Sequence, residues 1–193
     1  MPDINEVKQA LLQLDRHSED NWHLFEPLLQ PVAFSNGSFL AHMGRVSSAI
    51  YFISSGIVRV FAVHQDKEVS LDFAFPGQFS TAYASFITQQ PSIVSLQAIT
   101  PVNGFAFYYA DLQELYQRSH AAEHTGRLLA EYQYIRKYQR ELAFLQYSAK
   151  ERYLQLLAEH PRCDKVHNAY QYKHGSSSHQ CIMLPLLQPG NIQ

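Results

Sequence analysis

The chain has 193 residues, of which 46% are hydrophobic and 17% charged, and its formal net charge is −2. This composition excludes a wholly disordered chain, and the length fits one domain with an appendage or two small domains. The nearly balanced charge gives no overall attraction to nucleic acid or to anionic membranes, although it does not exclude a local basic patch.

The sequence predicts a cytoplasmic protein without a membrane segment. No apolar run reaches the roughly 18 residues of a transmembrane helix, and Asp3 and Glu6 stand where a signal peptide would be basic and then apolar. Cys163 and Cys181 are too few for a four-thiolate iron–sulfur cluster, and their use suits a reducing compartment. The His and Cys residues near the C-terminal end lack zinc-site spacing, so we expect no metal.

Residues 1–30 show the three- and four-residue spacing of apolar side chains that predicts helices, and Pro31 ends this region. From 31 to 117 the chain has short segments rich in β-branched and aromatic residues, separated by turn residues. Asn36-Gly37 is the strongest of these turn signals and predicts a hairpin. The expected six to eight strands have no helical crossovers between them. The fold class is therefore predicted to be α+β, with an antiparallel sandwich or barrel.

A capping-box pattern, Asp111 with Glu114, predicts that a helix begins at Asp111. The segment 118–147 then predicts one long helix, with an apolar seam over four heptads and aromatic residues on more than one face. Such a helix either packs only on its own domain or also pairs in parallel with a second copy. We expect a homodimer through this helix, with the interface at Leu128, Ile135, Tyr138, Leu142 and Leu145.

The remaining segments are less regular. Arg136, Lys137 and Arg140 are expected on the solvated side of the long helix. A second capping box, Ser148 with Glu151, predicts a short helix over 148–161. Residues 162–193 show no sustained periodicity and carry no Asp, Glu, Lys or Arg after Lys173, which predicts an irregular tail.

Three motifs in this order resemble the CRP/FNR superfamily of transcription regulators: "IYFISSGIVRVF" at 50–61, "FAFPGQF" at 73–79 and "SAKERYLQLLAEHP" at 148–161. The resemblance covers roughly 20–161. It implies a β-roll or jelly-roll domain of the cyclic-nucleotide-binding type at 31–117, a dimerisation helix at 118–147, and a helix that leads to a DNA-binding module. Regulators of this kind are not enzymes, and no catalytic arrangement is legible in the sequence.

The resemblance also places an effector pocket at the uncharged stretch "FPGQFSTAYASFITQQPSI", 75–93. Family members that bind cyclic nucleotides have a Gly-Glu pair for the ribose and an Arg for the cyclic phosphate. Thr81 and Ala82 stand in place of the pair and Ser92 in place of the arginine. We therefore expect no cyclic nucleotide to bind. Either an unknown neutral or weakly anionic effector binds, beside a short helix at 79–86, or side chains fill the barrel. The candidate pocket residues are Phe79, Ser80, Thr81, Tyr83, Ser85, Gln90 and Ser92.

The family's helix-turn-helix, which contacts DNA, has no recognisable counterpart in 162–193. This segment offers only three cations, Arg162, Lys165 and Lys173, and prolines bracket the place of a recognition helix. Either the module has been lost, or the reading frame slips after Pro161. Two functions follow as alternatives. The chain is a regulator-like sensor with a degenerate or truncated DNA-binding module, or it is a small-molecule-binding or protein-interaction module that acts without DNA.

Overall fold

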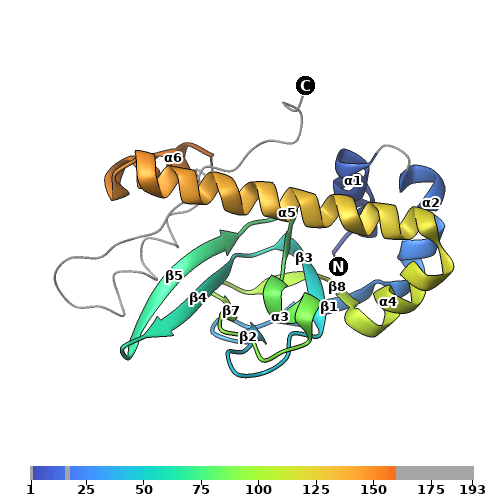
Figure 1. The fold of residues 1–193 in the computed structure, drawn as a ribbon, viewed down its shortest axis with the longest axis horizontal. Helices are drawn as coiled ribbons and strands as arrows, with labels where there is room; N and C mark the ends of the chain where they lie inside the picture. The colour runs from blue at the N-terminus through green and yellow to red at the C-terminus, as the bar shows by residue number, and fades with distance from the viewer. Residues whose placement is uncertain (1, 16–17, 160–193) are drawn as a thin grey trace.

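The computed structural model describes residues 2–15 and 18–159. Helices lie at both ends of the described chain, and eight strands lie between them with one short helix (Figure 1). The helical elements are α1 (Ile4–Leu14), α2 (Ser18–Phe25), the 3-10 turn η1 (Glu26–Leu28), α3 (Tyr83–Thr88), α4 (Tyr109–Arg118), α5 (His120–Gln146) and α6 (Ala149–Glu159). The strands are β1 (Gln30–Phe34), β2 (Phe39–Ala41), β3 (Ala49–Ser55), β4 (Val58–His64), β5 (Lys67–Ala74), β6 (Gln78–Ser80), β7 (Ser95–Ala98) and β8 (Val102–Tyr108).

The strands form two antiparallel sheets of four, in the orders β1-β8-β3-β6 and β2-β7-β4-β5. The expected α+β class and antiparallel roll are thus confirmed. Mostly small and branched side chains from both sheets, among them Val58 and Leu96, form one buried cluster together with Tyr51. Because side chains alternate across a strand, this cluster takes one face of each strand and leaves the other face for solvent or for helices.

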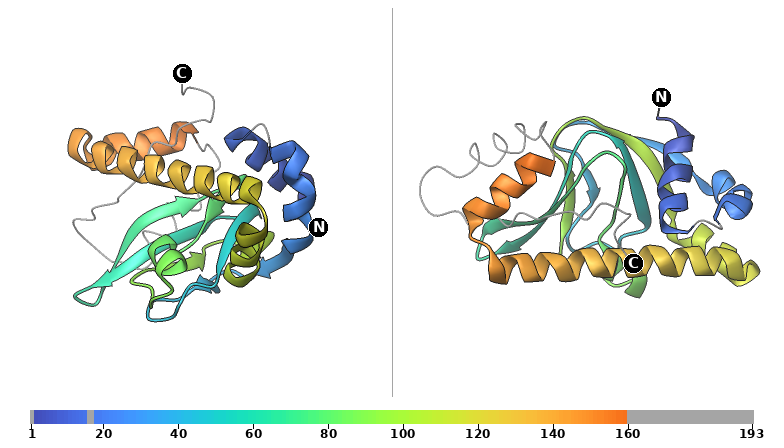
Figure 2. Two further views of the ribbon diagram at one scale, coloured as in Figure 1. Left: turned by 45° about the vertical axis from the view of Figure 1, so that its right-hand side comes forward. Right: turned by 90° about the horizontal axis from the view of Figure 1, so that it is seen from above.

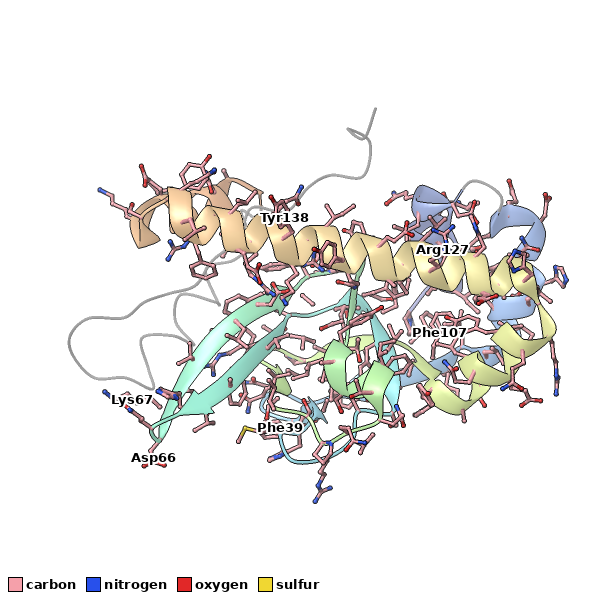
Figure 3. All side chains as sticks on the ribbon, viewed as in Figure 1. Phe39, Asp66, Lys67, Phe107, Arg127 and Tyr138 are labelled. Atoms are coloured by element: carbon pink, nitrogen blue, oxygen red, sulfur yellow. The ribbon has the colours of Figure 1, made fainter. Side chains whose placement is uncertain are left out.

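Helices cover the outer face of the first sheet. Phe52 and Phe107 point away from the first cluster and join a second one with side chains of α1, α2, α4 and α5. Figure 1 shows α1, α2, α4 and the first part of α5 grouped at one end of the roll, and the side-chain view places Phe107 between the roll and the helices (Figure 3). Strand β3 is therefore buried on both faces along most of its length, which explains its continuous apolar run.

The Asn36-Gly37 turn is present, but the predicted hairpin is wrong. β1 pairs with β8 and β2 pairs with β7, so this turn carries the chain from one sheet to the other. The tight hairpin is instead β4–β5, at Gln65 and Asp66, whose φ angles are 49° and 60°. Its free end projects from the roll (Figure 3). Turn residues indicate where the chain reverses, whereas strand pairing depends on partners distant in the sequence.

The predicted helix start at Asp111 is also wrong, because α4 begins at Tyr109. Its N-cap is Tyr108, whose side chain makes no capping bond, and the Tyr109 N–H donates to the carbonyl of Ser48 at 2.8 Å. A backbone acceptor on a neighbouring segment thus replaces the capping side chain. Asp111 lies in the first turn, where a carboxylate interacts favourably with the helix dipole.

The predicted capping box at Ser148 is present, and α5 has a cap at Ser119 that was not predicted. The Ser119 hydroxyl accepts from the Ala122 N–H at 3.2 Å, at the start of α5. At α6, the Glu151 carboxylate accepts from the Ser148 N–H at 2.7 Å and the Ser148 hydroxyl accepts from the Glu151 N–H at 3.4 Å. The bonds that the Glu151 carboxylate accepts from the Ser148 N–H and from the Ser148 hydroxyl, the latter at 2.8 Å, lower the pKa of Glu151 below its usual value.

The long helix α5 runs the length of the roll, with the N-terminal helices near one end and α6 turned back at the other (Figure 2). Within 2–15 and 18–159, no helix combines the length and the apolar character that a membrane crossing requires. The irregular tail predicted at 162–193 lies outside the described residues.

Candidate effector pocket

A cavity of about 510 Å³ lies between the roll and α5. Residues of the uncharged stretch and of its continuation to Val94 form one wall, residues of β4 and β5 form another, and α5 closes the third side. The volume falls within the range of about 300–1,000 Å³ typical of small-molecule sites. Most of its lining is apolar or aromatic, including Val60, Leu71, Tyr83, Ile93 and Tyr134.

Six of the seven predicted pocket residues line this cavity: Phe79, Ser80, Thr81, Tyr83, Ser85 and Ser92. Gln90 is not among the lining residues, and its backbone carbonyl accepts the Ser85 hydroxyl at 2.5 Å. The short helix expected at 79–86 begins later, because Phe79 and Ser80 belong to β6 and α3 starts at Tyr83. Pairing of β6 with β3 holds these two residues extended.

Three of the predicted hydroxyls already have partners within the protein. Thr81 donates to the Ala49 carbonyl at 2.8 Å, and Ser92 donates to the Val94 carbonyl at 2.8 Å. Ser85 bonds to Gln90, as described above, and accepts from the Ser47 N–H at 2.9 Å. These bonds fix the shape of the wall. Among the described residues, the hydroxyls of Ser80 and Tyr83 make no hydrogen bond to the protein.

The aromatic residues of the stretch divide between core and pocket. Phe79 is almost fully buried and packs edge-on against Phe52, with ring centroids 5.1 Å apart. Phe86 packs in the same way against Tyr109. Tyr83 is only partly buried, and this burial raises the pKa of its hydroxyl. The stretch thus partly fills the fold and leaves Tyr83 facing the cavity.

Cationic side chains of α5 line the cavity. Lys137 is 63% exposed, as expected, whereas the burial of Arg136 and Arg140 contradicts the expectation that they are solvated. Arg136, Lys137 and Arg140 are all lining residues, and the Arg136 side chain is only 8% exposed. The sequence does carry a signal for this position, because Arg136 lies seven residues from both Leu129 and Ala143, which are buried against the fold. Two helical turns separate residues that share a face.

These arginines meet one carboxylate, Asp72 of β5. Arg140 Nη1 lies 3.1 Å and Arg136 Nη2 lies 3.7 Å from Asp72 Oδ2. Arg140 Nη1 also donates to the Leu71 carbonyl at 3.0 Å, and Gln133 donates to the Phe79 carbonyl at 3.3 Å. The cavity therefore has fixed positive groups. They come from α5, outside the stretch 75–93, where the sequence led us to expect no charged anchor.

The middle part of the chain matches a known family model. Residues 31–119 match the model of the cyclic nucleotide-binding domain. This part of the chain is therefore similar to cyclic nucleotide-binding domains. The match ends just before α5, so the stretch at 75–93 lies within the matched region and the arginines lie on the helix that follows it.

Solved structures with this fold include CRP/FNR-type regulators. FixK2 from Bradyrhizobium japonicum aligns with a TM-score of 0.60 at 13% identity, over 69% of this chain and 66% of that one. The c-di-GMP-responsive global regulator CLP of Xanthomonas campestris gives 0.57 at 18%, over 73% and 71%. The Thermus thermophilus catabolite activator protein gives 0.51 at 22%, over 83% and 68%. At these identities the likeness is one of fold. No curated protein sequence matches the chain.

The face of α5 opposite the roll is open. Buried residues of α5, including Ala122, Leu129 and Ala143, face the fold. Of the residues predicted at a dimer interface, Tyr138 and Leu145 are exposed, and Leu128, Ile135 and Leu142 are half-buried. Thus α5 has one covered face and one uncovered apolar face.

A second, more open cavity of about 490 Å³ lies where α3 meets the outer side of α5. Its lining residues are Tyr83, Ala130, Glu131, Tyr134 and Ile135. Tyr83 and Tyr134 line both cavities. Among the described residues, no group of three or more His, Cys, Asp or Glu side chains could hold a metal ion.

Proposed function

We propose that this chain is a dimeric effector sensor of the CRP/FNR type, with a regulatory and not a catalytic role. The observation that carries the proposal is that α5 takes part in two features of the structure. One side of this helix closes the 510 Å³ cavity, and another side is an uncovered apolar face. In this proposal 31–117 is the effector domain and 118–147 is the dimerisation helix.

Ligand occupancy reaches α5 through two contacts. Gln133 bonds to the Phe79 carbonyl at the edge of the stretch, and Arg140 bonds to the Leu71 carbonyl on β5. Both contacts lie at the cavity, so a bound effector changes the position or the rigidity of the helix that joins the two copies. The energy available for such a shift is the difference in effector affinity between the two helix positions.

Cyclic AMP is not the effector in this proposal. Ala82 offers no carboxylate to a ribose, and Ser92 offers no guanidinium and is bonded to Val94. Loss of one buried charged partner weakens binding by about 2–5 kcal/mol, or roughly 30- to 4,000-fold. The positive groups of the cavity belong to α5 and not to the position of the family's arginine, and in this proposal they suit a different anion.

Direct DNA contact by this chain is not part of the proposal, because 162–193 carries only three cations. We expect no electrophoretic mobility shift of genomic fragments by the dimer, even at low salt. A shift that weakens steeply as salt rises would show phosphate contacts, and it would replace the sensor proposal with that of a DNA-binding regulator.

A further inference from the structure

Arg136 is the least satisfied charged group of the cavity. Its side chain is more than nine-tenths buried, and among the described residues neither Nε nor Nη2 has a hydrogen-bond partner, although Nη2 lies 3.7 Å from Asp72 Oδ2. Its remaining nitrogen, Nη1, makes only a long bond of 3.5 Å to Gln133. Buried polar groups in folded proteins nearly always have a partner, and a buried charge without one is strongly destabilising. A guanidinium in this state calls for an acceptor that the protein itself does not supply.

Asp72 cannot satisfy both arginines. Its Oδ1 accepts from the backbone N–H of Phe73 at 2.8 Å, so only Oδ2 faces α5. One oxygen is shared between two guanidinium groups, and neither receives the bidentate contact that makes arginine–carboxylate pairs strong. With Lys137, the cavity lining holds three cations and one carboxylate. Lys137 is largely exposed and its Nζ lies 3.6 Å from Glu141 Oε1, so Arg136, Arg140 and Asp72 leave one net positive charge at the cavity.

We propose that the cavity binds an organic anion, whose carboxylate, sulfonate or phosphate head contacts Arg136 and Arg140. The proposal rests on the sensor function above and names the chemical class of the effector. The head supplies the oxygens that Arg136 lacks, and an aromatic or apolar body packs against Tyr83 and Tyr134. Asp72 is the internal counter-ion, which holds the arginines in place and competes with the ligand for them.

This assignment couples the ligand to the dimer helix. In the empty cavity, Asp72 and the Leu71 carbonyl tie β5 to α5 through Arg140. An anion between the arginines weakens this tie and forms a new one from α5 to the ligand. The effector thereby replaces the contacts of Arg140 with Asp72 and Leu71 by contacts of α5 with the ligand.

The test uses two fluorescent probes that differ by one charged group. 8-Anilinonaphthalene-1-sulfonate is an aromatic sulfonate, and N-phenyl-1-naphthylamine is the same ring system without the sulfonate. We expect the wild-type chain to bind the sulfonate more tightly than the neutral probe. The double variant Arg136→Gln/Arg140→Gln should weaken sulfonate binding by about 10- to 100-fold, because hydrogen bonds to charged groups contribute more binding free energy than neutral ones. The same variant should leave binding of the neutral probe nearly unchanged.

Two further variants give the controls. Arg118→Gln/Arg127→Gln removes the same charge from exposed arginines that lie outside the cavity, and we expect it to bind both probes like wild type. Asp72→Asn removes the competing carboxylate and should tighten sulfonate binding. This gain of affinity keeps the proposal testable if the double arginine variant does not fold.

The outcomes separate the two proposals. If both probes bind with equal affinity in all variants, the anion assignment is wrong while the cavity remains a binding site. If neither probe binds the folded dimer, the sensor function fails as well. Cyclic AMP is then added as a competitor of the sulfonate. We expect the concentration of cyclic AMP that displaces the sulfonate to be at least about 30-fold higher than for a ligand of micromolar affinity. Displacement at micromolar concentration would contradict the exclusion of cyclic AMP.

Discussion

Replacing Gly56 by alanine is expected to lower the free energy of unfolding by about 2–5 kcal/mol. Gly56 joins β3 to β4 with a φ of +89°, and a Cβ there would lie 2.2 Å from the carbonyl oxygen of Pro101 and 2.9 Å from Val102 Cα. The positive φ contributes about 1–2 kcal/mol of strain. The contact with a backbone that cannot rotate away contributes about 1–3 kcal/mol more.

Gly77→Ala is the matched control. Gly77 has a similar φ of +85°, but no atom lies within 4 Å of its added Cβ. Alanine at this position should therefore lower stability by the strain alone, about 1–2 kcal/mol. Urea unfolding of the three proteins at one protein concentration measures the difference, since the stability of a dimer depends on concentration. An equal decrease in the free energy of unfolding in both variants would show that Gly56 does not lie as close to the backbone of Pro101 and Val102 as described.

Replacing Ile135 by aspartate is expected to raise the dissociation constant of the dimer by at least about a thousandfold. Ile135 is half-buried on the open face of α5. Twofold symmetry places two copies of each interface residue in the interface. An uncompensated buried charge costs about 3–5 kcal/mol, so two carboxylates exceed the roughly 4 kcal/mol that a thousandfold change requires.

Gln117→Asp gives the control, because Gln117 is exposed on α4 and lies outside the open face of α5. This variant should remain as dimeric as wild type. Sedimentation equilibrium over a range of concentrations measures the dissociation constant of the dimer for wild type, Ile135→Asp and Gln117→Asp. A wild-type chain that is monomeric at micromolar concentration, or an Ile135→Asp variant that dimerises as tightly as wild type, would contradict dimerisation through α5.

The parts of the fold that depend on local chemistry could be predicted from the sequence. Ser148 identifies the start of α6 because a capping bond joins residues only three apart. Turn residues and β-rich segments likewise identify the strands. The pairing of β1 with β8 could not be predicted, because it joins residues about 70 positions apart. For the same reason the Asn36-Gly37 turn was taken for a hairpin.

The candidate site was predicted in part. The stretch at 75–93 does line the cavity, but the roles of its hydroxyls depend on carbonyl groups that only the fold brings near them. Ser85 and Ser92 bond to Gln90 and Val94 and are not free for a ligand. Arg136 was missed because a charged residue on a helix usually faces water. Only its seven-residue spacing from Leu129 and Ala143 indicates the buried face.

The central claim, that arginines of α5 recognise the effector's anionic head, is tested most directly by nuclear magnetic resonance of the arginine side chains. The Nε–H signals of Arg136 and Arg140 can be assigned with the variants Arg136→Lys and Arg140→Lys. We predict that 8-anilinonaphthalene-1-sulfonate shifts both signals and that N-phenyl-1-naphthylamine shifts neither. Signals that stay in place while backbone amides of α3 respond to the sulfonate would contradict the claim.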